Sequence, residues 1–228
     1  LPRYCLWLVD APEDVKELPI VAERIERCRE MRLSSRDPGC RKLADRAYEF
    51  RDINNPSSAI VIPGVSSERR QYIPMGFIGK DTIVTNLCHM VPNGTLFEFG
   101  ILESGMHMTW MRTVCGRMKS DYRYSRDLCY NTFPWPSVTD NQKEIISNLA
   151  QRILDVREFY PEKTLSDLYD PDLMPVDLVK AHRELDAAIE KLYRKRPFDT
   201  DEQRLKHLFL RYEKLVNGED ASGLFSEE

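Results

Sequence analysis

The sequence lacks any long uncharged apolar run, any paired cysteines and any glycine-rich phosphate loop. A transmembrane helix needs about 18 or more consecutive apolar residues, so none is expected here. The six cysteines are scattered without a CxxC spacing, which favours reduced thiols in a cytoplasmic protein over a disulfide framework. The composition, 42% hydrophobic and 31% charged over 228 residues, is typical of a globular protein of one or two domains.

Signatures of catalysis are also missing. Neither HExxH nor GxSxG occurs, and the four histidines lie far apart in the sequence. The pair Cys88-His89 has no second ligand cluster at metal spacing, and the pair Asp170 and Asp172 is better explained by a turn that enters a helix. We therefore expect no catalytic residue, no metal site and no cofactor bound by this chain.

Charge is distributed unevenly around a net value of −4. Residues 1–136 hold 19 lysines and arginines against 17 acidic residues, whereas residues 137–228 hold 14 against 20. A nucleic-acid contact is therefore expected in the first part, where the segment Gly116–Arg126 concentrates basic side chains with two interleaved tyrosines. The charged residues of this segment are Arg117, Lys119, Asp121, Arg123 and Arg126.

The first part of the chain has the pattern of mixed helix and strand. The opening residues Leu1–Leu8 predict an apolar strand entered in mid-protein, so we expect the chain to be an excised portion of a longer protein. A helical spacer follows over about residues 11–48, with Pro19 either kinking the helix or marking its true start. Strands are predicted where β-branched and aromatic runs lie between Gly, Pro and Asn turns, at Ser58–Ile62, Tyr72–Ile78, Thr82–Val84 and Thr95–Ile101.

Helical spacing returns at Ser104–Cys115 and dominates the chain after residue 136. Thr139 with Gln142, and Thr200 with Gln203, match the pattern of capping boxes. The predicted fold class is therefore α+β. A mixed or antiparallel sheet with helices is expected over residues 1–136, an all-helical domain over 137–218, and a flexible tail over 219–228.

DNA recognition requires two separable kinds of contact, to phosphates and to base edges. Basic side chains in loops suit phosphates, and tyrosine hydroxyls can add neutral hydrogen bonds. An ordinary solvated basic loop is the alternative for each of them. The candidate phosphate contacts are Arg69, Arg70, Arg117, Tyr122, Tyr124 and Arg126.

Lys119 and Asp121 are candidates for base readout. They are two residues apart, so an extended segment would point both side chains the same way. A lysine donates to guanine O6 and N7, and an aspartate accepts from cytosine N4, so together they could read the two halves of one G·C pair. From the residues alone, a local surface ion pair is the alternative.

Five segments, in the same order, resemble the type IIL, MmeI-like restriction–modification proteins. Those proteins join a nuclease, an adenine-N6 methyltransferase and a target-recognition domain in one chain, and the nuclease and methyltransferase segments have no counterpart here. The helical end is similar too, through Leu165–Asp170 and Met174-Pro175. The five segments are Arg3–Leu8, Ile62–Pro74, Met106–Arg112, Val114–Tyr124 and Tyr130–Pro136.

The resemblance implies that this chain is the target-recognition and C-terminal helical portion of such an enzyme. Its implied partners are double-stranded DNA and the methyltransferase domain of the same parent chain, with S-adenosylmethionine and Mg²⁺ serving the parent enzyme. In the family, the positions that match Lys119 and Asp121 determine the outermost base pair, and this combination goes with guanine on the methylated strand. Near other specificity positions lie Asn86, Leu87 and Arg123, with Ser66–Glu68 as a further candidate.

Three functions compete on this basis. The first is sequence-specific DNA recognition for a bifunctional methyltransferase and endonuclease. The second is catalysis by the chain itself, against which the missing cofactor loop and metal-carboxylate cluster count. The third is a helical protein-interaction module without direct base readout, which steeply salt-dependent DNA binding would exclude.

Overall fold

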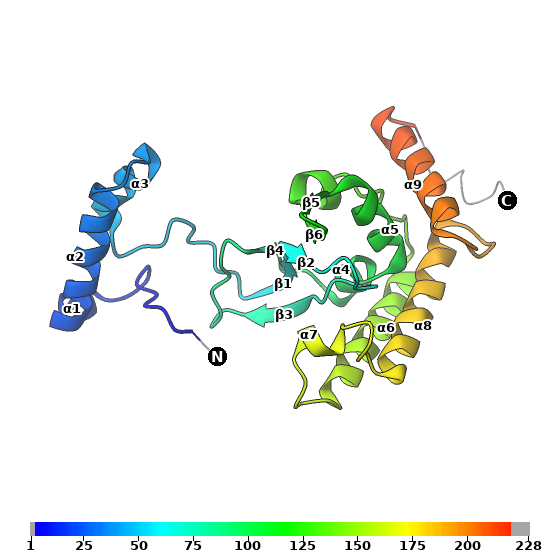
Figure 1. The fold of residues 1–228 in the computed structure, drawn as a ribbon, viewed down its shortest axis with the longest axis horizontal. Coiled ribbons are helices and arrows are strands. Elements are labelled where there is room, and N and C mark those ends of the chain that lie inside the picture. The colour runs from blue at the N-terminus through cyan, green and yellow to red at the C-terminus, as the bar shows by residue number, and fades with distance from the viewer. Residues whose placement is uncertain (1–2, 220–228) are drawn as a thin grey trace. The chain divides into compact units, whose positions relative to one another are not determined.

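The computed structural model describes residues 3–219, and the chain falls into two compact units, Leu1–Asn55 and Pro56–Glu228. The first unit is a small helical assembly, coloured blue in Figure 1. Part of the tail predicted at 219–228 lies outside the described residues, which end at Glu219. The helices of the first unit are α1 (Glu13–Glu17), α2 (Pro19–Leu33), α3 (Pro38–Lys42) and the 3₁₀ turn η1 (Leu43–Arg46).

Pro19 is the first residue of α2, which confirms the second of its two expected roles. Proline is tolerated there because the N–H that it lacks would have no partner within the helix. Near the end of α2, the buried Arg32 donates to three carbonyl oxygens of the return segment 43–49, at 2.6 to 2.9 Å. The strand expected at Leu1–Leu8 is wrong for the described residues 3–8, which are irregular and pair with no other strand.

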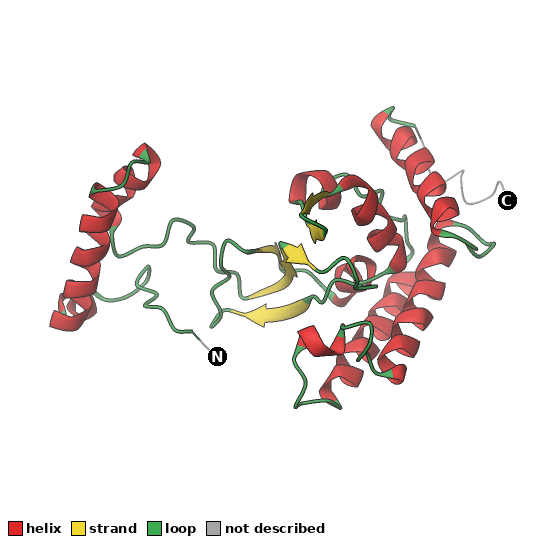
Figure 2. Ribbon diagram, in the orientation of Figure 1, coloured by secondary structure: helices red, strands yellow, loops and turns green. Residues whose placement is uncertain are grey.

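The second unit holds two small antiparallel sheets, whose strands lie between residues 58 and 123 (Figure 2). The first has the strand order β3-β1-β4 and the second the order β2-β6-β5. In the first sheet, Ile60 of β1 lies opposite Phe77 on one side and Val91 on the other. The strands are β1 (Ser58–Pro63), β2 (Val65–Ser66), β3 (Gly76–Gly79), β4 (Cys88–Pro92), β5 (Gly116–Met118) and β6 (Asp121–Arg123).

The strand expected at Ser58–Ile62 is confirmed as β1, but the other three need correction. The run Tyr72–Ile78 overlaps β3 only from Gly76, and Thr82–Val84 forms no strand. The run Thr95–Ile101 is helical, because it begins with a capping box in which Thr95 and Glu98 exchange side-chain and backbone hydrogen bonds. The resulting helix is α4 (Leu96–Leu102).

Helix α5 (Gly105–Val114) lies in the core of the second unit. Its side chains His107, Trp110 and Met111 are at most 1% exposed, so this face of the helix packs inward. After α5 come the β5–β6 hairpin and a π-helical turn, η2 (Arg126–Tyr130). The hairpin therefore projects directly from the C-terminal end of a buried helix.

The last part of the chain is helical, as predicted. The hydroxyl of Thr139 caps α6 within a complete capping box, and Thr200 caps α9 through the N–H of Gln203. The side chain of Gln203 accepts from the N–H of Asp199 and so does not complete a box at Thr200. The helices are α6 (Asp140–Glu158), α7 (Leu165–Leu168), α8 (Val176–Tyr193) and α9 (Asp201–Val216).

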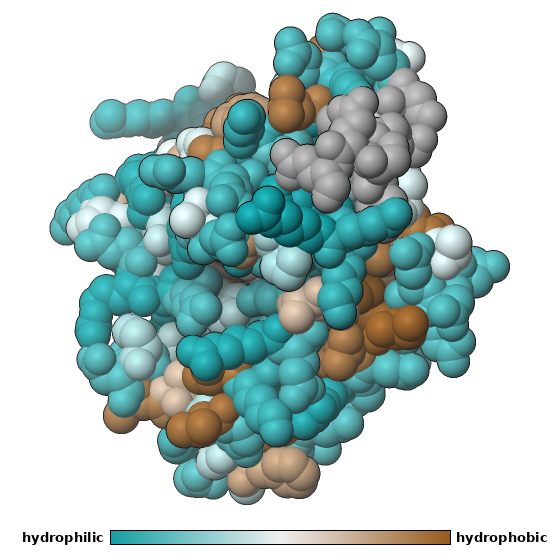
Figure 3. Space-filling view, turned by 90° about the vertical axis from the view of Figure 1, so that its right-hand side faces the viewer, coloured by the Kyte–Doolittle hydropathy of each residue, from teal (hydrophilic) through white to brown (hydrophobic). Residues whose placement is uncertain are grey.

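The helical part shares one hydrophobic core with the sheets and with α4 and α5. One face of α8 packs into that core, and its side chains Leu178, His182 and Leu185 have no exposed surface. Seen from the side of α8 and α9 (Figure 3), the outer surface is largely hydrophilic with scattered hydrophobic patches. No helix among residues 3–219 is both long and apolar enough to cross a membrane.

A buried ion pair also crosses this core. Arg157 of α6 donates to the carboxylate of Glu103, at 2.8 Å, and to the carbonyl oxygen of Met75, at 2.7 Å. Its Nε–H reaches the hydroxyl oxygen of Tyr169 at 2.9 Å. Burial raises the pKa of the Glu103 carboxyl, and the guanidinium counteracts part of that rise. Residues on both sides of position 137 therefore depend on each other.

Candidate nucleic-acid interface

The β5–β6 hairpin carries the residues expected to read a base pair. Met118 pairs with Asp121, which leaves Lys119 and Ser120 as the two central residues of the turn. Lys119 has a φ of 58°, a positive value for which glycine is the usual residue in such turns. The expected extended segment is therefore wrong at this point: Lys119 lies in the turn and Asp121 in the last strand pair.

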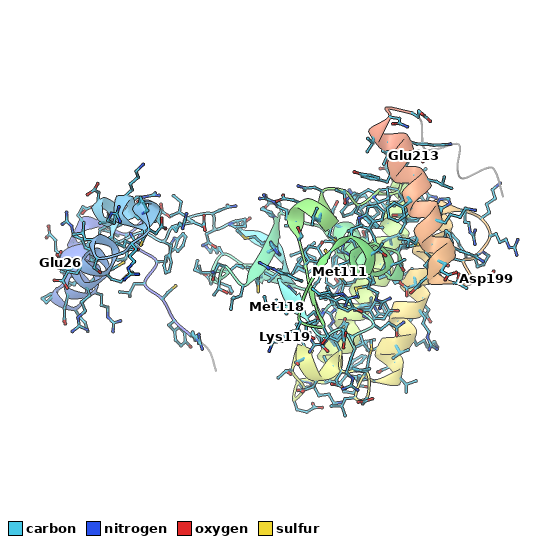
Figure 4. The ribbon with its side chains drawn as sticks, turned by 45° about the horizontal axis from the view of Figure 1, so that its top comes forward. Glu26, Met111, Met118, Lys119, Asp199 and Glu213 are labelled. Atoms are coloured by element: carbon cyan, nitrogen blue, oxygen red, sulfur yellow. The ribbon has the colours of Figure 1, made fainter. Side chains whose placement is uncertain are left out.

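The tip of the hairpin is exposed to solvent. In Figure 4, Met118 and Lys119 lie at the tip, away from Asp199 on the side of α8 and α9. The side chain of Lys119 has no hydrogen-bond or ion-pair partner among residues 3–219. Its ammonium group is therefore available to a ligand.

Asp121 faces the loop that follows β2. Its Oδ1 accepts from the backbone N–H of Glu68 at 3.4 Å. Its other carboxylate oxygen has no hydrogen bond within the described part of the chain. The turn thus places one donor, on Lys119, next to one remaining acceptor, on Asp121.

Tyr122 and Tyr124 do not present their hydroxyls to solvent, which corrects the expectation of phosphate contacts. Tyr122 is 6% exposed and donates to the carbonyl oxygen of Glu68 at 3.0 Å. The hydroxyl of Tyr124 lies 3.2 Å from Nε2 of His107, and burial raises its pKa well above the usual value. Both rings point inward, since they occupy alternate positions on the strand side that faces the core. They support the hairpin from below.

Arg117 stays close to the hairpin. Its guanidinium lies over the ring of Tyr122, 4.2 Å from the ring centre, and donates to the carbonyl oxygen of Ser120 at 3.2 Å. The residue is exposed and has no acidic partner among the described residues. Its positive charge is therefore uncompensated, as a phosphate contact requires.

A groove of about 670 Å³ opens beside the hairpin. It brings together four residues that the sequence analysis had singled out from distant segments: Asn86, Leu87, Arg123 and Arg126. Three exposed apolar side chains, which the sequence analysis did not identify, also line it. They are Val65, Met118 and Leu128, exposed by 41%, 48% and 55%.

The backbone of the turn with Asn86 and Leu87 is tied to β1 and β2 at Gly64, although the side chain of Leu87 is 74% exposed. The N–H of Gly64 donates to the carbonyl oxygen of Leu87 at 2.9 Å. A Cβ at position 64 would come within 2.7 Å of that oxygen, so only glycine allows the close approach. Leu87 is thus one of four exposed apolar side chains that line the groove, with Val65, Met118 and Leu128.

The basic residues of the groove differ in how far their charge is compensated. Arg126 pairs with Asp127 at 2.9 Å, and this pairing raises the pKa of the guanidinium. Arg123 is exposed and has no ion-pair partner within residues 3–219. Arg123 is therefore the more available cation of the two.

Arg69 and Arg70, the other candidate phosphate contacts, are engaged by the helical part of the chain. Arg69 pairs with Asp172 at 2.5 Å. Arg70 donates to the hydroxyl of Ser166 at 2.8 Å and to that of Ser66 at 3.3 Å. Both arginines thus have partners within the protein.

The described part of the chain holds no group of three or more His, Cys, Asp or Glu residues arranged to bind a metal ion. Around one groove, this part of the chain presents an exposed lysine, a carboxylate oxygen without a hydrogen bond, arginines without an acidic partner and exposed apolar side chains. Donors, acceptors and apolar contacts of this kind are those that read base edges in a DNA groove.

Known proteins resemble this chain over most of its length. Residues 1–137 match the MmeI target recognition domain, and residues 138–218 match the MmeI C-terminal domain. DNA methyltransferase A of Bacillus subtilis (strain 168) is 45% identical over 216 residues, which are 94% of this chain and 24% of that protein. A solved structure of the type IIL restriction–modification enzyme MmeI in complex with DNA is 39% identical with a TM-score of 0.89, over 93% of this chain and 29% of that one. The chain thus spans less than a third of the length of either relative.

Proposed function

The chain belongs to the MmeI family, and on this premise we propose that it reads DNA sequence for a larger modification–restriction enzyme. The single observation that carries the proposal is the tip of the β5–β6 hairpin. There the ammonium of Lys119 and one carboxylate oxygen of Asp121, both without a partner among residues 3–219, lie beside a groove that also holds Arg123. Chain segments far apart in sequence converge on this one surface.

In this proposal, Lys119 and Asp121 jointly read one G·C pair, immediately 3′ of the adenine that the parent enzyme methylates. The ammonium donates to guanine O6 and N7, and the carboxylate accepts from cytosine N4. Asn86, Leu87 and Arg123 face the neighbouring base pairs from the groove. Arg117 contacts a phosphate, because it combines exposure with an uncompensated charge.

The parent enzyme provides the chemistry. We propose that it is a cytoplasmic DNA adenine-N6 methyltransferase that uses S-adenosylmethionine, with an Mg²⁺-dependent nuclease in the same chain. The B. subtilis relative is named as a DNA methyltransferase, and the MmeI structure is that of a restriction–modification enzyme with DNA. The methyltransferase domain of the parent is then the partner that this chain delivers to its target site.

Exchanging donor and acceptor tests the proposal. In the full-length enzyme, the double change Lys119→Glu with Asp121→Arg should turn the preference at the outermost position from G·C to C·G. Each wrong pairing should cost about 1–3 kcal/mol, or roughly 5- to 150-fold in preference. The measurement is sequencing of methylated sites in cells that carry either enzyme.

Arg117→Ala is the matched control, because a lost phosphate contact weakens binding to all sequences alike and flattens the salt dependence. If the outermost base of the methylated sites stays G after the exchange, Lys119 and Asp121 are not its readers. DNA binding without a salt slope would favour the interaction-module alternative.

A further inference from the structure

The loop Ser67–Arg70 lies between the recognition hairpin and the helical part of the chain. On the hairpin side, the backbone of Glu68 makes two hydrogen bonds. Its carbonyl oxygen accepts from the hydroxyl of Tyr122 at 3.0 Å, and its N–H donates to the carboxylate of Asp121 at 3.4 Å. The strand before the loop continues this contact, since Ser66 of β2 lies opposite Tyr122 of β6. The position of the Asp121 carboxylate is therefore coupled to the position of this loop.

On its other side, the loop is held by α7 and by the turn that follows it. Arg69 pairs with Asp172, and Arg70 donates to the hydroxyl of Ser166. That turn is itself ordered, because the N–H of Asp172 donates to the side chain of Asp170 at 2.9 Å. Two adjacent arginines thus fasten the loop to residues that the C-terminal part contributes.

Both ends of the loop are anchored in the interior. Ser66 is 3% exposed at one end and Tyr72 is 1% exposed at the other. The hydroxyl of Tyr72 donates to Asp186 at 2.6 Å, and its ring stacks on His182 of α8 with centres 4.1 Å apart. Between these anchors, the contacts of Arg69 and Arg70 tie the loop to the helical part of the chain.

From these contacts we infer that Ser166 and Asp172 are positioning residues for base readout, acting through the loop Ser67–Arg70 on Asp121. The inference rests on the proposed function. A reading side chain must be held within about 0.5 Å of its productive position by its supporting contacts. The C-terminal helical domain therefore sets how sharply the outermost base pair is discriminated, although it touches no base.

This role differs from the phosphate contact expected of Arg69. If an arginine binds phosphate, its removal lowers the affinity of the enzyme for every DNA sequence. If an arginine positions Asp121, its removal lowers discrimination at one base pair and leaves the salt dependence of binding unchanged. Because exposed ion pairs add little to the stability of the fold, unfolding measurements do not distinguish the two roles, whereas sequence selectivity does.

The test uses the full-length enzyme with Asp172→Asn, with Ser166→Ala and with both changes. Sequencing of methylated sites should show discrimination at the outermost base pair reduced by about fivefold or more, with the inner positions unchanged. Glu144→Gln is the matched control, because it removes one exposed charge from the same domain without contacting the loop. Asp172→Glu keeps the carboxylate and should restore most of the discrimination.

A double-mutant cycle of Arg69→Ala with Asp172→Asn completes the test. If the pair positions Asp121, the two effects on discrimination do not add. If Arg69→Ala alone weakens all sites and flattens the salt slope, the inference is overturned in favour of a phosphate contact. If the exchange at Lys119 and Asp121 alters the base read while the loop variants change nothing, the inference fails and the proposed function stands.

Discussion

The backbone of Lys119 has a positive φ, a conformation that is unfavourable for a residue with a side chain. A positive φ strains any residue with a Cβ, whereas glycine adopts it freely. Among the described residues other than glycine, only Asn93 shares this feature, and asparagine tolerates it better than lysine does. Strain of this kind is commonly found where a side chain is kept for function.

The free energy of unfolding of the Lys119→Gly variant should therefore be about 1 kcal/mol higher than that of Lys119→Ala, because only glycine adopts the positive φ without strain. Both changes remove the ammonium group, so both should lose discrimination of the guanine. Urea unfolding of the two variants measures the first effect, and mapping of methylated sites the second. Equal unfolding midpoints would show that the turn is unstrained.

Sequence reasoning identified which residues belong to the site better than how they are arranged. Asn86, Leu87 and Arg123 were singled out and do line one groove. The inward direction of Tyr122 and Tyr124 was missed, because the burial of alternate strand positions depends on what lies behind the hairpin. Nothing in the sequence around residue 122 reports the contact with Glu68, more than 50 positions earlier.

Helix α4 and the β5–β6 hairpin show the same limit for whole elements. The apolar run Leu96–Ile101 is buried on both sides of the helix, so periodicity alone could not separate helix from strand. The capping pattern of Thr95 and Glu98 was the signal that could have decided it. The hairpin was missed because its turn, Lys119-Ser120, lacks the Asn-Gly or Asp-Gly pair typical of such turns. Helices α6 and α9 were predicted because Thr139 and Thr200 match capping patterns, and both residues do cap a helix. Helix α8 begins without a side-chain cap.

The ion pair between Arg157 and Glu103 joins α6 to the end of α4, so its loss should destabilise the packing of both helices. Arg157→Met should lower the free energy of unfolding by about 3–5 kcal/mol, because it leaves the Glu103 carboxylate buried without its partner. Arg152→Met is the control on the same helix. It breaks an exposed pair with Glu184 and should cost about 1 kcal/mol or less. Comparable shifts of the urea midpoint in the two variants would contradict the buried role.

For the second unit as a whole, three buried groups should shape the dependence of stability on pH. Burial lowers the pKa of His182 to about 3 and that of His107 to about 4, so the unfolded chain takes up two more protons as the pH falls below about 6.5. Burial raises the pKa of Asp186 to about 6, so the folded chain takes up one proton in the same range. The contribution of the two histidines to the free energy of unfolding is lost as the pH falls, whereas the contribution of Asp186 is lost as the pH rises through about 6.

Between pH 6 and pH 4.5, His107, His182 and Asp186 together lower the free energy of unfolding by about 1.4 kcal/mol for each pH unit of acidification, and the raised pKa of Glu103 reduces this slope. Asp186→Asn removes one of the two opposing carboxyl groups, so the slope should become steeper. Urea unfolding at several pH values compares the variant with the parent sequence. An unchanged slope would mean that Asp186 ionises normally in the folded protein.

The ion pair of Glu103 with Arg157, the hydrogen bond of Tyr72 to Asp186 and the pair of Arg69 with Asp172 all cross position 137, where one matched family domain ends and the next begins. Recombination between relatives at that position would combine a recognition part with helices that had not co-evolved with it. A chimera that exchanges residues 56–218 as one block keeps all three pairs intact. New specificities in this family should therefore be inherited with the helices attached.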